Sequence, residues 1–531
     1  MMDANKVPLS PLSFLDRAAE VFPTKIAVYR PTAEPITYAE LHTRALQLAA
    51  ALADVGVGKG DRVAILAPND VELLEAHSGI PAAGASIVAL NVRLAPQEYE
   101  QILRHAGCRV LIVDRSLRDR VQGIRDRVEA LELIVEIDPG QDTTSEVDYG
   151  TWLARTSVRR MTLGLPDDEH DPIAVNYTSG TTGHPKGVVY THRGAYLNAM
   201  GQALQFGLSS GSVYLWTLPM FHCNGWCYTW AVTAVGATHV CTRSFDAAAA
   251  LEDIERRGVT HLCGAPIVLS SLAEAGVGQD RPFSHAVRAA TGGAPPSPTV
   301  LARMRSLGVE VVHLYGLTET YGPSLVCELQ PSWDGLDAQQ LAEKQSRQGV
   351  RTINVQDVRV VDDQLVDVPN DGDTVGEIVV RSNTVMAGYL HDPEATSAAF
   401  HGGWVRTGDL AVRHPDGYAE IRDRAKDIII SGGENVSSIE VENVIAQHPK
   451  VLEVAVVAAA HDTWGEVPVA FVTLREGETA TSEEVVAFVR ERLAGFKTPK
   501  AVTFQELPRT STGKIRKNEL RSLVSALPQQ E

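Results

Sequence analysis

The chain of 531 residues lacks the features that mark several classes of protein. Its six cysteines are scattered at positions 108, 223, 227, 241, 263 and 327, which is too sparse for a disulfide framework. No apolar run approaches the roughly 20 residues that span a membrane, and residues 1–10 lack the basic and apolar regions of a secretion signal. We therefore expect a soluble, cytoplasmic protein with no membrane partner.

Basic residues are also fewer than acidic residues. The chain has 48 Lys and Arg against 66 Asp and Glu, so its formal net charge is −18. Binding to a nucleic-acid backbone requires clustered cations, so we expect no nucleic-acid partner. Low-complexity tracts and internal repeats are absent too, and any polyphosphate must be held by a local site.

The common catalytic motif His-Glu-x-x-His is missing. His222, Cys223 and Cys227 lie close together, but no second pair of ligands accompanies them, which disfavours a zinc site. Cys223 is also disfavoured as a nucleophile activated by His222, because adjacent residues on a strand point to opposite faces.

Short apolar runs alternate with helical stretches through about the first 420 residues. We predict strands at 62–67, 86–90 and 109–113, and helices at 71–83 and 96–105. This alternation is typical of an α/β fold with largely parallel strands.

The last 100 or so residues differ in pattern and match the size of a small domain. We predict strands at 454–457 and 469–474, then an amphipathic helix at 482–493 capped by Ser482. This pattern indicates a compact α+β unit, joined to the first part by the charged segment 422–427. The alternative for that segment is a solvated turn within one domain.

The loop Tyr177–Gly187 follows the apolar run Ile173–Val175 and combines hydroxyls, glycines and Lys186. Glycines allow close approach of backbone to a ligand, and N–H groups, hydroxyls and an ammonium together bind phosphate oxygens. The loop is not a Walker A sequence, because Pro185 precedes the lysine. A polar surface loop is the alternative.

Four further motifs follow in the order Gly292–Pro295, Tyr315–Thr320, Trp404–Asp409 and Pro508–Lys514. They offer, respectively, a tight turn, an aromatic ring with a hydroxyl and a carboxylate, a carboxylate suited to two vicinal hydroxyls, and a lysine after a small-residue loop. Taken singly, each is as well explained by an ordinary turn or an exposed charge.

Together and in this order, the motifs resemble the ANL family of adenylate-forming enzymes, over almost the whole chain from about Leu12 to Leu520. The resemblance implies a large multi-layer N-terminal domain with mixed sheets (1–424) and a small mobile α+β C-terminal domain (425–531). Residues 218–226 and 431–435 look like those of acyl-CoA synthetases. Similarity is greatest to members that use short- to medium-chain, methylthioalkanoic or arylpropenoic acids.

The resemblance also implies roles for individual residues. Those that would hold the β- and γ-phosphates of ATP are Thr178, Ser179, Gly180, Thr181, Thr182 and Lys186. Those implied around the adenine are Tyr315 and the turn that contains Gly293, Ala294 and Pro295, while Gly316 is implied as a further cofactor-binding residue that also borders the acid pocket. Ribose would bind Asp409 and Arg424, and the pantetheine of coenzyme A would pass Gly432 and Gly433.

The catalytic residues implied by the resemblance are Lys514, Glu319, Thr318 and His222. Lys514 would bridge the acid and the α-phosphate, Glu319 would bind Mg²⁺, Thr318 would contact the α-phosphate, and His222 would stand beside the carboxylate. Lys426 corresponds to the hinge between the domains. The acid pocket would be lined by Asn224, Trp226, Tyr228 and Gly292.

The implied function is ATP-dependent activation of a small carboxylic acid to an acyl-adenylate, followed by thioester formation with coenzyme A. One alternative is a stand-alone adenylating enzyme that transfers its product to a carrier protein or a non-thiol nucleophile, or that activates another oxyanion. Another is a nucleotide sensor without chemistry. The acid, the acceptor, the pathway and the oligomeric state stay open, with a homodimer as one alternative.

Overall fold

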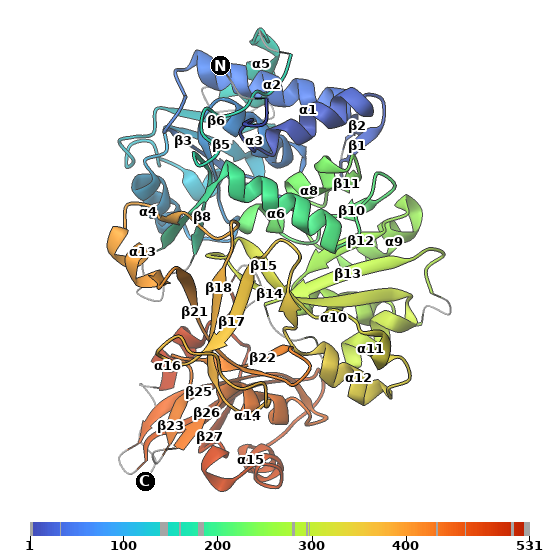
Figure 1. Cartoon of the computed structure of the whole chain (residues 1–531), viewed down its shortest axis with the longest axis vertical. Helices are drawn as coiled ribbons and strands as arrows, with labels where there is room; N and C mark the ends of the chain where they lie inside the picture. Colours follow the sequence, from blue (N-terminus) through green and yellow to red (C-terminus); the bar gives the residue numbers. More distant parts are fainter. Residues whose placement is uncertain are drawn as a thin grey trace. The chain divides into compact units, whose positions relative to one another are not determined.

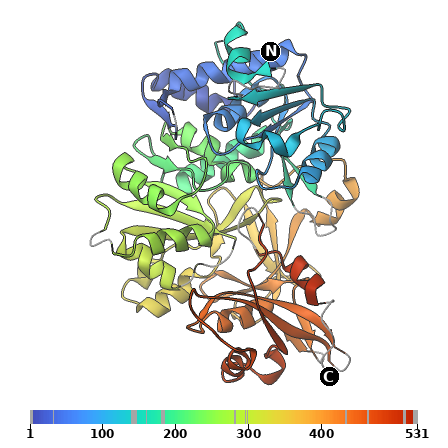
Figure 2. The same ribbon diagram turned by 180° about the vertical axis from the view of Figure 1, so that it is seen from behind.

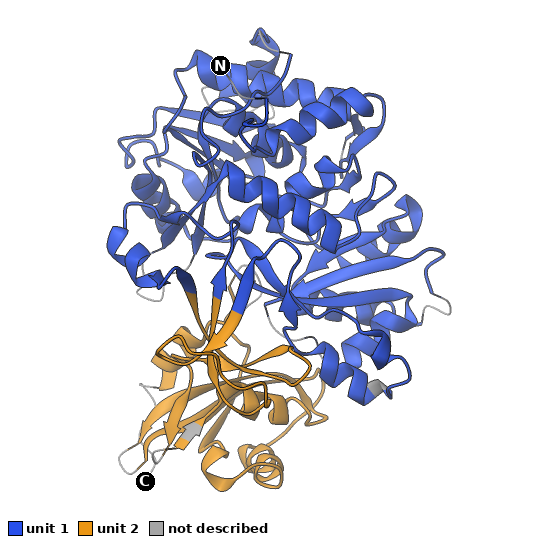
Figure 3. Cartoon of the chain, viewed as in Figure 1, with its two compact units in different colours: residues 1–358, 380–405 blue, residues 359–379, 406–531 orange. Residues whose placement is uncertain are grey.

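The computed structural model describes residues 4–31, 33–138, 147–158, 161–178, 185–278, 282–293, 296, 298–431, 434–461, 464–510 and 515–524. The chain divides into two compact units (Figure 3). Unit 1 comprises 1–358 and 380–405, and unit 2 comprises 359–379 and 406–531. The division passes through β17 (Asp357–Val361), β18 (Gly376–Arg381) and β21 (Trp404–Arg413). The domain boundary expected at 424/425 lies inside unit 2 and stays a prediction.

An eight-stranded sheet forms one layer of unit 1 (Figure 1). Its strands, in spatial order, are β19 (Gly388–Tyr389), β9 (Lys186–Thr191), β8 (Pro172–Thr178), β4 (Ser86–Ala89), β3 (Arg62–Leu66), β5 (Val110–Asp114), β6 (Leu133–Ile137) and β7 (Val147–Asp148). The pairs β3–β4 and β3–β5 are parallel, as the sequence predicts, whereas β9 is antiparallel to both its neighbours. The sheet is therefore mixed.

A second, nine-stranded sheet completes unit 1. Its strands, in spatial order, are β16 (Val350–Arg351), β15 (Gly322–Val326), β14 (Val309–Leu317), β13 (Val287–Gly292), β12 (His261–Gly264), β10 (Val213–Leu215), β11 (Thr238–Val240), β1 (Ile26–Tyr29) and β2 (Ile36–Thr37). The strands from β14 to β1 run parallel, and β15 turns back on β14.

Thirteen helical segments are described in unit 1, of which α7 is a single left-handed turn. They are α1 (Leu12–Val21), α2 (Tyr38–Asp54), α3 (Val71–Ala82), α4 (Pro96–Ala106), α5 (Tyr149–Arg155), α6 (His192–Gln205), α7 (Cys223–Trp226), α8 (Tyr228–Ala234), α9 (Ala247–Arg257), α10 (Pro266–Ala275), α11 (Pro298–Ser306), α12 (Ala338–Gln345) and α13 (Pro393–Ala399). Local sequence sets their ends: α4 starts with Pro96 in its first turn and ends at Gly107, whose φ is 60°.

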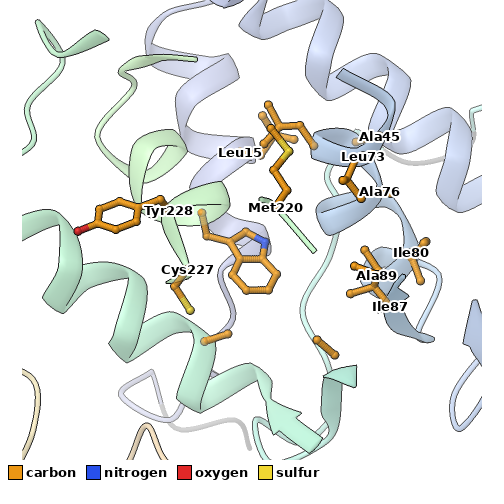
Figure 4. Packing of buried hydrophobic residues seen from close by; sticks show 14 of the residues in the cluster. Leu15, Ala45, Leu73, Ala76, Ile80, Ile87, Ala89, Met220, Cys227 and Tyr228 are labelled. Carbon is orange, nitrogen blue, oxygen red and sulfur yellow. The ribbon is translucent and has the colours of Figure 1, made fainter. Parts of the chain in front are cut away.

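The core of unit 1 covers both faces of the eight-stranded sheet. Alternate residues point to opposite faces, so Ile65 and Ile87 join one apolar cluster while Ala64 and Val88 join another. In the first cluster, residues of α1, α2 and α3 pack against the segment 220–228 (Figure 4). In the second cluster, α4 packs against the other face of the sheet. Figure 2 shows the same ribbon from behind, with the N-terminal part of the chain in blue.

Unit 2 has a five-stranded sheet of β24 (Glu434–Val436), β23 (Ile429–Ser431), β26 (Gly465–Leu474) and β25 (Val451–His461), with β27 (Ala501–Phe504) paired to β26. Its helices are α14 (Ser438–Ile445), α15 (Ser482–Arg490) and α16 (Lys517–Val524). The two predicted strands are confirmed and are longer than expected. The predicted helix is confirmed, but its cap is Thr481, whose hydroxyl accepts the Glu484 N–H.

Candidate active site

The predicted phosphate loop spans the turn of a β-hairpin. β8 ends at Thr178 and β9 begins at Lys186, and these two residues are cross-strand partners. Both ends of the loop are therefore held side by side by the sheet. Gly187 follows the loop with little free space, because a Cβ there would lie 3.0 Å from Val175 and 3.1 Å from Tyr177.

Glu319 lies two residues after the end of β14 and is held through both its backbone and its side chain. Its carbonyl accepts the Met386 N–H at 2.9 Å, and its Oε1 accepts the Tyr389 hydroxyl at 2.8 Å. The Lys186 ammonium lies 4.8 Å from the centroid of the same tyrosine ring, which is a cation–π distance. Tyr389 thus connects an anion and a cation that are far apart in the sequence.

Tyr389 is a site residue that sequence reasoning missed. It lies on the two-residue strand β19, where Gly388 pairs with Val189 and Tyr389 pairs with Val188. Burial, and then the charge of Glu319, raise the pKa of Tyr389, so its hydroxyl stays protonated at neutral pH. A Gly–Tyr dipeptide carries no local signal for this role, which depends on pairing between distant strands.

Thr318 and Gly316 lie in a tightly bonded stretch at the end of β14. The Thr318 carbonyl accepts the Tyr190 hydroxyl at 2.7 Å and the Tyr321 N–H at 2.9 Å. Gly316 cannot be replaced without backbone movement, because a Cβ there would lie 1.8 Å from the Gly322 carbonyl oxygen. Tyr315, expected at the adenine, is buried on the same strand.

Two asparagines fix the segment that leads to His222. Asn69 accepts the Met220 N–H at 2.8 Å, and Asn176 donates to the Phe221 carbonyl at 2.6 Å. Since Asn176 lies on β8, it connects the acid-pocket segment with the strand that ends at the phosphate loop.

After His222 the chain makes a left-handed turn. Positive φ angles are found at Cys223 (48°), Asn224 (52°), Gly225 (60°), Trp226 (53°) and Cys227 (65°). Our expectation that His222 and Cys223 lie on a strand is therefore wrong. A left-handed conformation costs about 1–2 kcal/mol per non-glycine residue, so surrounding contacts must impose it, and such strain gathers at functional sites.

The predicted acid-pocket residues meet at this turn. The Trp226 ring lies over β13, with Cη2 at 3.2 Å from the position of a Cβ at Gly292. Asn224 is fully buried, and its Oδ1 accepts the Tyr321 hydroxyl at 2.9 Å. Within the described residues, its Nδ2 has no hydrogen-bond partner.

Tyr228 borders a cavity of about 160 Å³ between α6, α8 and the strands β13 to β15. Its hydroxyl lies 3.4 Å from Gln202 Oε1. The cavity floor includes Val312, Leu314 and Val326. Leu314 is the cross-strand partner of Gly292, the residue that the Trp226 ring covers. The cavity therefore lies next to the predicted acid pocket.

In unit 2, the antiparallel pair β21 and β22 (Ala419–Arg424) brings the two predicted ribose residues together. Asp409 and Arg424 are cross-strand partners, and Arg424 Nε donates to Asp409 Oδ1 at 2.9 Å. The Asp409 side chain is 4% exposed and that of Arg424 is 41% exposed. Lys426 follows in the next turn, and burial, aided by Arg424, lowers its pKa.

Several predicted residues lie outside the described part of the chain. They are Ser179, Gly180, Thr181, Thr182, Ala294, Pro295, Gly432, Gly433 and Lys514. Gly293 is described and has a φ of 94°, a conformation that favours glycine.

The described residues contain no group of three or more His, Cys, Asp or Glu arranged to hold a metal ion. All six cysteines are buried and unpaired by disulfides. Among the described helices, none has the length and apolar character needed to cross a bilayer.

Comparison with known families gives two matches in sequence. Residues 15–390 match the model of the AMP-binding enzyme family, and residues 440–514 match the AMP-binding enzyme C-terminal domain. A peroxisomal butyrate–CoA ligase of Arabidopsis thaliana is 44% identical over 99% of this chain and 95% of its own length. An acetate–CoA ligase of Humulus lupulus is 42% identical over 98% and 95%.

Solved structures agree with the sequence matches. An anthranilate–CoA ligase in complex with anthranoyl-AMP superposes with a TM-score of 0.86 at 27% identity, over 99% of this chain and 100% of that one. An o-succinylbenzoate–CoA synthetase from Bacillus subtilis with its acyl-adenylate gives 0.83 at 29% identity, over 97% and 98%. The chain therefore belongs to the AMP-binding enzyme family, within the ANL superfamily of adenylate-forming enzymes.

Proposed function

We propose that this enzyme activates a small carboxylic acid with ATP and transfers the acyl group to coenzyme A. The observation that carries the proposal is the arrangement of Lys186, Tyr389 and Glu319 beside the hairpin loop that begins at Thr178. It offers one cation and one anchored carboxylate at the place where a triphosphate would lie. The acid–CoA ligase names of its relatives support the same chemistry.

In the first step, a carboxylate oxygen of the acid bonds to the α-phosphorus of ATP, and the bond to the pyrophosphate oxygen breaks. Two anions must approach each other, so fixed positive charge is needed. Lys186 and the loop from Thr178 would hold the β- and γ-phosphates, and Thr318 would contact the α-phosphate. Asp409 and Arg424 would bind the ribose hydroxyls, while Tyr315, Gly316 and the turn at Gly293 would hold the adenine.

Glu319 fits a role in binding Mg²⁺. A carboxylate oxygen is a hard ligand of the kind Mg²⁺ prefers, and one or two carboxylates with phosphate oxygens are its usual protein environment. Tyr389 fixes Oε1, and in the described residues this is the one hydrogen bond to the carboxylate. When bound, Mg²⁺ would stabilise negative charge on the phosphate oxygens.

Lys514 would bridge the attacking carboxylate and the α-phosphate in this step, with His222 beside the carboxylate. In the second step, the coenzyme A sulfur attacks the acyl carbon, the thiol proton is lost and AMP leaves. Rotation at Lys426 would withdraw Lys514 and bring Gly432 and Gly433 beside the pantetheine.

The acid we propose is a compact aliphatic or aryl acid. Trp226 occupies the space above Gly292, which limits the length of the acyl group. Acetate, butyrate, 2-methylpropanoate and benzoate are the acids in the names of the relatives. A carrier protein in place of coenzyme A, a homodimer and a cytoplasmic location also stay proposals, and the peroxisomal location in the relatives' names belongs to those proteins.

An acid panel tests the proposed function. ATP–pyrophosphate exchange would be measured with aliphatic acids of increasing length and with aryl acids, and AMP release with coenzyme A, a pantetheinylated carrier or no acceptor. We expect exchange with at least one compact acid and AMP release that requires coenzyme A. Exchange with no acid would contradict the proposal, and equal AMP release without an acceptor would favour the non-thiol alternative.

Lys514→Ala tests the assignment of the catalytic lysine. We expect ATP–pyrophosphate exchange to fall by roughly 100-fold or more, the scale for losing one positioned charge. Thioester formation from supplied acyl-adenylate should be spared. Lys500→Ala, an exposed lysine of the same unit, is the control. Equal losses in both half-reactions would contradict the assigned role.

A further inference from the structure

The C-terminal helix α16 is fastened to two other parts of unit 2 by ion pairs. Near its end, Arg521 forms a close ion pair with Asp427, the residue after the proposed hinge. At its start, Lys517 Nζ lies 2.7 Å from Glu442 Oε1 and 2.7 Å from Ser438 Oγ on α14. The helix begins three positions after Lys514.

These contacts lie in a partly buried environment. The side chains of Asp427 and Glu442 are 10% and 18% exposed. Burial raises the pKa of the Glu442 carboxyl, while Lys517 and the Val456 N–H favour its charged form. Removing one partner of such a pair leaves an uncompensated charge, so the pairs constrain the helix more than surface ion pairs would.

The chain on either side of residues 511–514 is also held. Arg509 and Ile515 form an isolated β-bridge, and the Arg516 N–H donates to the Pro508 carbonyl at 2.8 Å. Arg509 in addition forms a close ion pair with Glu453 on β25. The described residue next to Lys514, Ile515, is therefore fixed relative to the sheet of unit 2.

The proposed hinge segment belongs to the same network. Asp427 and Ile428 donate their N–H groups to the Arg424 carbonyl at 2.8 and 3.2 Å. Asp423 accepts the Ser438 N–H at the start of α14, and the Ser437 hydroxyl donates to the Arg422 carbonyl. The turn after β22, the start of α14 and α16 are thus connected without a break by polar contacts.

We propose that Arg521 and Lys517 are positioning residues, which transmit rotation at Lys426 to the segment that carries Lys514. The inference rests on the proposed function, in which Lys514 acts in adenylation. Without the Arg521–Asp427 pair, the hinge would turn but Lys514 would arrive displaced. Thioester formation would not suffer, because residues 432 and 433 lie between β23 and β24 in the chain, and neither ion pair of α16 involves a residue of β23, β24 or β26.

The test compares two half-reactions in Arg521→Ala. We expect ATP–pyrophosphate exchange to fall roughly 10- to 100-fold, because a misplacement of about 1 Å can cost 100-fold. Thioester formation from supplied acyl-adenylate should be unchanged. Arg521→Lys should recover part of the exchange rate. Lys450→Ala removes another ion pair of unit 2, with Glu484 at 2.9 Å, and should match the wild type.

The other outcomes are also decisive. Equal loss in both half-reactions with a lowered melting temperature would assign Arg521 a purely structural role and overturn the proposal. If the role is purely structural, Asp427→Asn, which removes the same ion pair by changing its other partner, should also slow both half-reactions. Exchange at the wild-type rate in Arg521→Ala would overturn the positioning role alone. Absence of exchange by the wild type with every acid would overturn the proposed function, and the positioning role with it.

Discussion

Glu319 in unit 1 and Asp409 in unit 2 are two carboxylates to which we assign ligand-binding roles, and they are held by different kinds of partner. In unit 1, Glu319 accepts a hydrogen bond from Tyr389, a neutral phenol, at 2.8 Å. In unit 2, Asp409 accepts one from Arg424, a cation, at 2.9 Å. The Tyr389 hydroxyl is neutral and does not offset the negative charge of the carboxylate, whereas Arg424 offsets that of Asp409.

This difference indicates what each carboxylate can bind. A carboxylate whose hydrogen-bond donor is neutral keeps its attraction for a cation, which suits a divalent metal ion at Glu319. A carboxylate already paired with arginine gains little from a second cation, but its oxygens still accept hydrogen bonds, which suits the neutral hydroxyls of ribose at Asp409. We therefore propose that Glu319 recognises a cation and that Asp409 recognises neutral hydroxyl groups.

The largest expected effect is that of Glu319→Gln, which removes the charge and keeps the shape. We expect the rate of ATP–pyrophosphate exchange to fall roughly 100-fold or more, because a bound metal ion contributes several kcal/mol to such chemistry. The Mg²⁺ concentration for half-maximal rate should also rise. Glu310→Gln, in an exposed pair with Arg288, is the control. An unchanged Mg²⁺ dependence would mean that Glu319 acts by hydrogen bonding, and the contrast between the units would disappear.

The loop from Thr178 to Lys186, the two carboxylates and Arg424 could be singled out from local motifs and from the family resemblance, and their roles toward a nucleotide stay predictions. Thr178 and Lys186 end a loop of glycines and hydroxyls, and the structure places them opposite each other on paired strands. Tyr389 could not be predicted, since its contact with Glu319 arises from the pairing of β19 with β9, far apart in the sequence. The left-handed turn at Cys223–Cys227 was missed for a similar reason: distant contacts such as Tyr321 to Asn224 impose a conformation that local propensity disfavours.

In the fold, too, features that depend on local sequence could be predicted, and features that depend on distant contacts could not. Apolar runs such as 62–66 and 110–114 became parallel strands as predicted, because burial on both faces gives continuous apolar sequence. The antiparallel course of β9 and β15 has no comparable signal, since it depends on which edge of a sheet the chain meets next.

A smaller effect is expected for Asp409→Asn. It should raise the KM for ATP roughly 10- to 100-fold, which corresponds to about 1.5–3 kcal/mol for hydrogen bonds to a charged group. The Mg²⁺ dependence should stay that of the wild type, and the preference for ATP over 2′-deoxy-ATP should shrink. Asp367→Asn, which breaks an exposed pair with Arg359 of nearly equal length (2.8 Å), is the matched control. A shift in Mg²⁺ dependence would show that the two carboxylates share one role.

The smallest expected effect is that of Tyr389→Phe, which keeps the ring near Lys186 and removes the hydroxyl that holds Glu319. Because a single hydrogen bond contributes about 0.5–1.5 kcal/mol, we expect the Mg²⁺ concentration for half-maximal exchange to rise roughly 2- to 10-fold. The KM for ATP should stay unchanged, since the contact between the ring and the Lys186 ammonium remains. Tyr99→Phe is the matched control, because its hydroxyl also makes a 2.8 Å bond, to the Asn91 carbonyl in another part of unit 1. A rise in the KM for ATP without a change in Mg²⁺ dependence would contradict the view that a neutral donor orients Glu319 for a cation.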